Sequence, residues 1–205
     1  MPDFAKALLD TIDLRAETKW LKQRLESENC PVVFCHNDMQ EGNILMCQDF
    51  DKENNNADPK LSFDIANHFA EWAYDYTEPN HPFYREDWTN YPTDKQRLAF
   101  VRAYLDERGS RENPKKVLRE VEVFTLASHF FWSLWGVVNA GTSKIPFGYW
   151  TTTKNCSKIF VNDMAKIVSH FPQNCTWQNK WKKCESPTKP KTAIDDAFVE
   201  ADAVS

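Results

Sequence analysis

The sequence lacks the features that mark several large classes of protein. It has no excess of positive charge, since 25 Lys and Arg residues stand against 30 Asp and Glu residues for a net charge of −5. Its basic residues are also scattered, which argues against a broad nucleic-acid-binding surface. No apolar run approaches the length of a membrane span, and the first residues show no signal-peptide pattern. We therefore expect a cytoplasmic protein without a membrane span or a nucleic-acid partner.

Cysteine pairs of the kind that bind zinc are also missing. The six cysteines include no Cys-x-x-Cys spacing, so we interpret them as reduced thiols rather than as metal ligands or a disulfide framework. No internal repeat is visible. What is present is a hydrophobic fraction of 41% and an aromatic fraction of 14% in 205 residues. That composition is enough for one globular domain with a substantial core.

Hydrophobic periodicity predicts a mainly helical chain. A capping box starts one helix, because Thr93 is followed three residues later by Gln96. Asn113 and Pro114 are typical of the N-cap and the first position of the longest helix. The expected helices cover residues 3–27, 64–75, 93–109, 113–139 and 156–170, with short strands around 32–35 and 44–47, irregular segments at 48–60 and 76–92, and a disordered tail from 182.

The most informative stretch is the decapeptide from His36 to Leu45, His-Asn-Asp-Met-Gln-Glu-Gly-Asn-Ile-Leu. It places Asp38 and Asn43 five positions apart in a polar turn between two apolar segments. In kinase-like phosphotransferases, such a loop holds an Asp that accepts the proton of the attacking hydroxyl and an Asn whose carbonyl holds Mg²⁺. An ordinary hairpin turn rich in Asp, Asn and Gly fits the decapeptide equally well. Both interpretations stay open on these residues alone.

Two further blocks connect the decapeptide with a known family. Together with residues 34–45 they resemble the C-terminal lobe of the choline/ethanolamine kinases, and the resemblance covers roughly residues 1–149. The two blocks are Phe-Asp-Ile-Ala-Asn-His-Phe-Ala-Glu-Trp at residues 63–72, and Ala-Ser-His-Phe-Phe-Trp-Ser-Leu-Trp-Gly at residues 127–136 with Ile-Pro-Phe-Gly-Tyr following at 145–149.

The resemblance implies an α+β, mainly helical fold, namely the C-terminal lobe of a protein-kinase-like fold of the aminoglycoside-phosphotransferase type. Residues 1–149 would form this lobe, residues 150–181 a divergent terminal helix, and residues 182–205 a disordered tail. The functional segments of the lobe would be the catalytic loop at residues 34–46 and the substrate-pocket helices at 63–76 and 113–140.

The resemblance also implies roles for individual residues. Asp38 would be the catalytic base for the choline hydroxyl, with a turn-capping carboxylate as the structural alternative, and Asn43 would bind Mg²⁺ on ATP. Glu71 would be the counter-charge for the substrate, or else lie at the solvent edge of its helix. The trimethylammonium group cannot donate an ordinary hydrogen bond and needs aromatic faces. The implied aromatic cage consists of Tyr76, Phe83, Trp132, Trp135 and Phe147.

Several of these residues have a structural alternative. Trp132 and Trp135 are three positions apart on a helix and project to neighbouring positions, so without the family they would be assigned to core packing. Asp64 is interpreted as structural within its helix. We interpret His68 and His129 as hydrogen-bonded structural histidines rather than as metal ligands, because nothing spaces them for a metal.

Three departures from the family pattern bear on activity. From the resemblance we expect the chain to begin at the interlobe region, without the family's N-terminal lobe that covers the nucleotide. The family's Asp-Phe-Glu-Tyr segment, whose Asp is a principal Mg²⁺ ligand, is missing, because residues 61–63 lead directly into the second block. The Asp-Phe-Asp at residues 49–51 is too close to Asn43 to replace it. Thr152 stands where an aromatic cage residue is expected.

From the resemblance we expect a choline kinase-family protein. The inherited reaction is the ATP-dependent phosphorylation of choline to phosphocholine in phosphatidylcholine biosynthesis, and we expect the shortened chain to be inactive by itself. One alternative is a non-catalytic module that binds choline or a full-length kinase subunit. The expected assemblies are a homodimer or a heterodimer with the full-length kinase. Another is an ethanolamine kinase.

Overall fold

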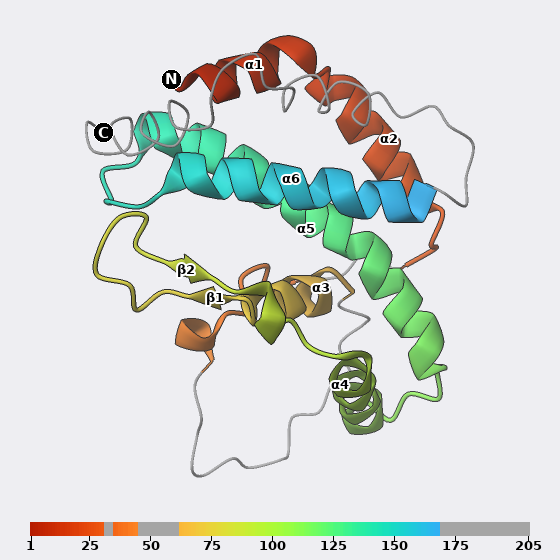
Figure 1. Cartoon of the computed structure of the whole chain (residues 1–205). Coiled ribbons are helices and arrows are strands. Elements are labelled where there is room, and N and C mark those ends of the chain that lie inside the picture. The colour runs from red at the N-terminus through yellow and green to blue at the C-terminus, as the bar shows by residue number, and fades with distance from the viewer. Residues whose placement is uncertain (31–34, 45–61, 169–205) are drawn as a thin grey trace. The chain divides into compact units, whose positions relative to one another are not determined.

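The computed structural model describes residues 1–30, 35–44 and 62–168, and these are mainly helical (Figure 1). The strands expected at 32–35 and 44–47 lie outside the described residues except at one end, and the segment 48–60 and the tail from 182 lie outside them entirely. The elements in chain order are α1 (Asp3–Thr11), α2 (Leu14–Glu26), the 3₁₀ helix η1 (Glu41–Asn43), α3 (Ser62–Glu71), β1 (Tyr74–Asp75), β2 (Arg85–Glu86), the 3₁₀ helix η3 (Trp88–Asn90), α4 (Asp94–Glu107), α5 (Pro114–Thr142) and α6 (Tyr149–Val168).

The chain divides into two compact units, each assembled from segments that are distant in the sequence. Unit 1 consists of Met1–Gln23, Tyr76–Arg85 and the residues from His129 on. Unit 2 consists of Arg24–Asp75 and Glu86–Ser128. The strands β1 and β2 pair in a two-stranded sheet, so the fold of the described residues is helical with little sheet.

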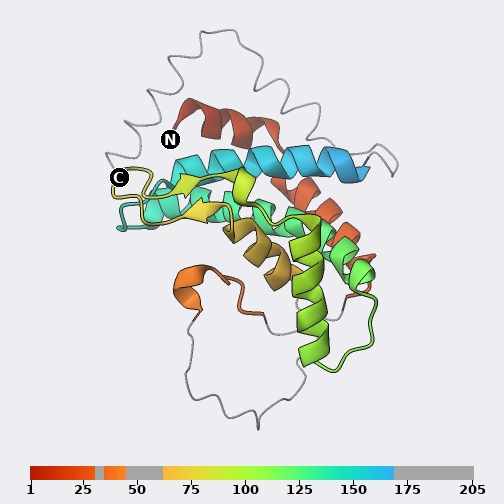
Figure 2. The ribbon, with the colours of Figure 1, turned by 60° about the horizontal axis from the view of Figure 1, so that its bottom comes forward.

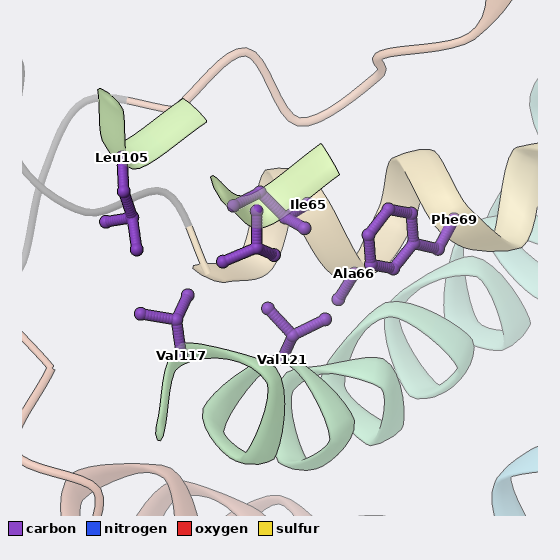
Figure 3. Close-up of a cluster of buried hydrophobic side chains, with 7 residues drawn as sticks. Ile65, Ala66, Phe69, Leu105, Val117 and Val121 are labelled. Carbon is purple, nitrogen blue, oxygen red and sulfur yellow. The ribbon is translucent and has the colours of Figure 1, made fainter. Parts of the chain in front are cut away.

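Unit 2 has a hydrophobic core made by α3, α4 and the start of α5 (Figure 3). On α3, Ile65, Ala66 and Phe69 follow the three-four spacing of one helix face, and all three are buried. Figure 3 shows this face of α3 turned toward side chains of α4 and α5. The cluster consists of Ile65, Ala66, Phe69, Val101, Leu105, Val117 and Val121. Burying one of its larger side chains stabilises the fold by about 1.5–3 kcal/mol, so α3 is firmly held.

The two helix starts that the sequence predicts in unit 2 are confirmed. Thr93 and Gln96 form a complete capping box at the start of α4, in which the Thr93 N–H donates to Gln96 Oε1 over 2.9 Å. At the start of α5, the Lys115 N–H donates to Asn113 Oδ1 over 3.0 Å. These local hydrogen bonds satisfy donors that a helix leaves unpaired at its first turn.

Unit 1 is built around α6 and the second half of α5, which lie side by side in both views (Figures 1 and 2). Their close approach requires a glycine, because a Cβ added at Gly136 would lie 2.4 Å from Thr153 Oγ1. The Thr153 hydroxyl also donates to the Ser133 carbonyl over 3.2 Å. The first helix joins this unit through Phe4, whose ring centroid lies 6.3 Å from that of Trp150 on α6.

The single helix expected at residues 3–27 is wrong, because the chain forms two helices there. Asp13 separates α1 from α2, and its Oδ1 accepts hydrogen bonds from the N–H groups of Arg15 over 3.1 Å and Ala16 over 3.0 Å. A side-chain acceptor of this kind is an N-cap, which starts a new helix.

Two other helices differ from expectation at their ends. The helix expected from residue 156 begins at Tyr149 instead, and residues 143–148 connect it with the end of α5. The helix expected to run to residue 75 ends at Glu71, and the following residues form a turn and β1.

Among the described residues, α5 is the one helix that is long and apolar enough to cross a membrane by length and composition, and half of its most apolar window is buried inside the protein. The core helix of a soluble protein passes the same test.

Candidate functional site

The loop that carries Asp38 and Asn43 is closed on itself by hydrogen bonds. The Asn43 side-chain amide donates from Nδ2 to the Asp38 carboxylate over 2.9 Å and to the Asp38 carbonyl over 2.8 Å. Gln40 caps the 3₁₀ helix η1, which ends at Asn43, by accepting the Gly42 N–H over 2.8 Å. The two residues that the sequence singled out are therefore brought together.

This arrangement fits a magnesium ion in its choice of atoms. The Asn43 amide nitrogen is engaged by Asp38, which leaves the amide oxygen as the acceptor that the side chain can offer to a cation. Amide and carboxylate oxygens are the ligands that Mg²⁺ takes in proteins. Within residues 1–30, 35–44 and 62–168, no group of three His, Cys, Asp or Glu side chains gathers as a metal site. Asp49 and Asp51 lie outside the described residues.

A buried carboxylate on α3 anchors the beginning of the same loop. Asp64, which is 1% exposed, accepts the backbone N–H of His36 at Oδ2 over 2.7 Å and that of Asn37 at Oδ1 over 2.6 Å. The sequence predicts a structural role for Asp64 but does not predict which backbone groups it contacts. Burial raises the pKa of the adjacent Cys35 thiol, and the negative charge of Asp64 adds to this effect.

A second side chain of α3 contacts the middle of the loop. The His68 Nδ1 atom lies 2.9 Å from the Met39 carbonyl oxygen, and the Trp72 indole N–H donates to His68 Nε2 over 3.2 Å. The interpretation of His68 as a hydrogen-bonded histidine is consistent with these contacts.

Unit 2 also contains a cavity of about 540 Å³ beside the loop. Two carboxylates, Glu41 and Glu71, line it together with aromatic rings. The aromatic lining residues are His68, Trp72, Tyr74 and Tyr91. Glu71 was selected from the sequence as a counter-charge, whereas the three larger rings were not selected. A volume of this size is in the range of small-molecule sites, and carboxylates with aromatic faces suit an organic cation.

The residues expected to form the aromatic cage belong to unit 1, and four of the five fall into one cluster. Ring centroids of Trp132 and Trp135 lie 5.2 Å apart, and those of Trp135 and Phe147 lie 6.0 Å apart. Tyr84 stacks on Phe147 at 5.3 Å and lies 6.3 Å from Tyr76. We call these residues the aromatic cluster: Tyr76, Tyr84, Trp132, Trp135 and Phe147. Phe83, the fifth expected member, has its ring 6.2 Å from that of His81.

Tyr84 is the member of the aromatic cluster that the sequence reading missed. It lies in a stretch with three prolines that was expected to be irregular, and no periodicity marks it. Its hydroxyl accepts a hydrogen bond from Thr152 Oγ1 over 3.3 Å, and both side chains are buried. Thr152, which stands where an aromatic residue was expected, therefore contacts the cluster through a hydroxyl group.

Comparisons with known proteins identify relatives of the chain. The family model described as Choline/ethanolamine kinase matches residues 1–161. A human choline/ethanolamine kinase is 41% identical over 183 residues, covering 79% of this chain and 45% of the relative. An Arabidopsis thaliana protein named probable choline kinase 3 is 36% identical over 169 residues, covering 78% of this chain and 48% of the relative. The chain thus spans about half the length of these curated relatives.

Solved structures give the same relationship. A choline kinase from Cryptosporidium parvum superposes with a TM-score of 0.52 at 27% identity, covering 67% of this chain and 39% of that one. An ethanolamine kinase from Plasmodium vivax superposes with a TM-score of 0.54 at 26% identity, covering 76% of this chain and 43% of that one.

Proposed function

The chain belongs to the choline/ethanolamine kinase family, and from that premise we propose that it serves the ATP-dependent phosphorylation of choline to phosphocholine, a step toward phosphatidylcholine. We further propose that residues 1–149 correspond to the C-terminal lobe of a kinase-like fold. The observation that carries the proposal is the pair of hydrogen bonds from Asn43 to Asp38, because it orients the two side chains that this chemistry requires.

Asp38 is the proposed base. In phosphoryl transfer to an alcohol, a carboxylate accepts the proton that the attacking hydroxyl loses. Asp38 is half-buried, and the Asn43 amide holds one of its carboxylate oxygens. Asn43 would hold Mg²⁺ through its amide oxygen, and the ion would neutralise charge on the phosphates when bound. The role of Asn43 toward Asp38 is therefore orientation.

The aromatic cluster and Glu71 support choline as the substrate. A quaternary ammonium gains about 2 kcal/mol over a desolvated aromatic face, and Trp135 has three aromatic neighbours within 6.0 Å: Trp132, Phe147 and Tyr149. Glu71 is buried and lines the cavity of unit 2. We assign the quaternary ammonium to the aromatic cluster of unit 1, and we keep Glu71 as a separate candidate counter-charge in the cavity of unit 2.

We propose that the 205-residue chain turns over slowly or not at all by itself. The resemblance implies that the Asp of an Asp-Phe-Glu-Tyr segment binds the metal in the family. That segment is missing here, because residues 61–63 lead directly into the block at residues 63–72. Phosphoryl transfer depends on positioning and metal charge more than on covalent assistance. Asp38 would then retain its geometry with a poorly held nucleotide.

The test is an incubation of the chain with Mg²⁺, ATP and choline, followed by phosphorus NMR for phosphocholine, with Asp38→Asn as the matched control. We expect no phosphocholine above the level of the control, together with measurable choline binding. Phosphocholine that disappears in Asp38→Asn would overturn the proposed inactivity and support the reaction. A folded chain with neither turnover nor choline binding would refute the proposed function.

A non-catalytic choline-binding module is the second candidate. It is favoured by the aromatic cluster, which forms from residues of unit 1 alone. Binding of choline or of a full-length kinase subunit that is unchanged in Asp38→Asn would favour this candidate.

The preference for choline over ethanolamine is part of the proposal. Ethanolamine carries a primary ammonium that donates hydrogen bonds, and it gains less than choline from aromatic faces. Competition between the two amines for the chain distinguishes a choline kinase from an ethanolamine kinase, which is the named activity of the structurally similar Plasmodium vivax protein.

A further inference from the structure

We propose that His68, held in one neutral tautomer by Trp72, is a positioning residue for the loop that carries Asp38 and Asn43. This inference deepens the proposed function and rests on it for its catalytic meaning. The contacts that carry it all lie within unit 2, between the side of α3 and the backbone of the loop.

The two hydrogen bonds of the imidazole fix its tautomer. An indole N–H can donate and cannot accept, so the 3.2 Å contact with Trp72 requires a lone pair on His68 Nε2. A neutral imidazole with a lone pair on Nε2 carries its hydrogen on Nδ1. That hydrogen then points to the Met39 carbonyl oxygen, 2.9 Å from Nδ1. His68 therefore donates to the loop and accepts from Trp72.

A hydrogen bond to the Met39 carbonyl restrains the backbone next to Asp38, because Met39 directly follows Asp38 in the chain. The N–H of Asp38 already donates to His36 Nδ1 over 3.3 Å. With the Asp64 contacts at the start of the loop and the Asn43 contact at its end, the hydrogen bond from His68 supplies the restraint in the middle. A restraint at this carbonyl limits rotation of the backbone that carries the Asp38 carboxylate.

The three anchoring side chains lie on one face of α3. Asp64, His68 and Trp72 are spaced four residues apart, which places them one above the other along the helix and just beyond its end. The imidazole is also packed, with the Phe100 ring centroid 5.1 Å away and the Trp72 ring at 6.2 Å and nearly perpendicular. Packing of this kind holds the ring plane so that both nitrogen atoms keep their partners.

Asparagine and phenylalanine are informative replacements for His68. Asparagine keeps a side-chain N–H donor near the position of Nδ1 but loses the acceptor for Trp72. Phenylalanine keeps the ring volume and loses both hydrogen bonds. A purely packing role predicts that phenylalanine is the better replacement, whereas a positioning role predicts that asparagine is.

The experiment uses the full chain labelled with nitrogen-15 and needs no turnover. A long-range nitrogen–proton NMR spectrum at neutral pH reads the tautomer of His68, and amide hydrogen exchange reads the order of the loop at the Asn43 N–H. That N–H donates to the Gln40 carbonyl over 3.0 Å. His81→Phe, the same change in unit 1, is the matched control.

We expect His68 to carry its hydrogen on Nδ1. Exchange at Asn43 should rise roughly three- to tenfold in His68→Phe, the effect of losing one hydrogen bond, and should remain near the wild-type rate in His68→Asn and in the control. If His68→Phe does not fold, Trp72→Phe serves instead, with the expected appearance of the second tautomer of His68.

A hydrogen on Nε2 in the wild-type chain would overturn the proposal. Unchanged Asn43 exchange in a folded His68→Phe variant, or an unmixed tautomer in Trp72→Phe, would do the same. These readouts are separate from the proposed reaction. A folded chain that shows the expected tautomer but neither binds nor phosphorylates choline refutes the proposed function and leaves the positioning of the loop standing.

Discussion

The Asn43 side-chain amide donates to the carboxylate of Asp38 over 2.9 Å and to its backbone carbonyl over 2.8 Å. Each side chain therefore sets the orientation of the other, although the two residues are five positions apart in the chain. Because the Asn43 side-chain nitrogen donates to Asp38, the Asn43 amide oxygen is the atom left for a cation. This geometry is compatible with the proposal that Asp38 is a base and Asn43 a metal ligand.

Replacing Asp64 should destabilise the fold strongly. Asp64→Ala removes the acceptor of two backbone N–H groups, and hydrogen bonds to a charged group contribute about 1.5–3 kcal/mol each. We expect a loss of about 3 kcal/mol or more in the free energy of unfolding, measured by urea denaturation. Asp94→Ala, at an exposed position, is the control. A stability within about 0.5 kcal/mol of wild type would show that Asp64 does not anchor the loop.

Gly136 should not tolerate a side chain. A Cβ there would lie 2.4 Å from Thr153 Oγ1 and 2.7 Å from the Tyr149 carbonyl oxygen, which is backbone and cannot move aside cheaply. We expect Gly136→Ala to lower the free energy of unfolding by about 1–3 kcal/mol. Gly141→Ala on the same helix meets nothing within 4 Å and should raise it by up to about 1 kcal/mol. Equal effects of the two substitutions in thermal melts would contradict the close packing of α5 on α6.

The free energy of unfolding should decrease as the pH falls, because His129 is buried in its neutral form. Burial lowers the pKa of His129 to about 4, although the charge of Asp163 opposes the shift. In the unfolded state the histidine has its ordinary pKa of about 6.5, so the unfolded chain binds the proton more readily than the folded chain. The contribution of His129 is therefore complete above about pH 6.5 and decreases as the pH falls toward 4.

The size of this effect can be isolated with a variant. Between about pH 7.5 and pH 5, His129 should account for a loss of about 2 kcal/mol. Denaturant unfolding of wild type and His129→Gln at both pH values gives the difference in slope, which removes the contribution of other groups. Parallel pH dependences of the two proteins would show that His129 is not buried in its neutral form.

Replacing Trp135 should weaken the binding of choline. Trp135→Ala removes a ring from the centre of the aromatic cluster, and we expect choline affinity to fall roughly ten- to thirtyfold, which corresponds to about 1.4–2 kcal/mol. Val138→Ala, on the same helix and 62% exposed, is the control. Calorimetric titration measures both. Equal affinities would move the ammonium site away from the aromatic cluster, and Tyr91→Ala in the unit 2 cavity would then be the next variant to test.

Local signals in the sequence predicted the starts of α4 and α5 and pointed to Asp38 and Asn43 as a pair. The capping box at Thr93, the Asn113–Pro114 pair, and the spacing of Asp38 and Asn43 are all properties of neighbouring residues, and each corresponds to hydrogen bonds in the structure. Patterns of this kind are readable because the partners are only a few residues apart.

Long-range contacts were not predictable from the sequence. Asp64 binds backbone N–H groups at His36 and Asn37, 28 and 27 residues away, and a backbone donor leaves no trace in the sequence. The break at Asp13 was hidden because apolar spacing continues on both sides of it. Tyr84 joins the aromatic cluster from an irregular segment in which no period exists to mark a buried face.

The most direct test of the account is a calorimetric titration of choline into the 205-residue chain, with ethanolamine as the competing amine and circular dichroism to establish that the chain is folded. The account predicts saturable binding of choline at a single site, and weaker binding of ethanolamine because a primary ammonium gains less from aromatic faces. A folded chain that gives no saturable heat with choline would contradict the central claim that it carries a choline site.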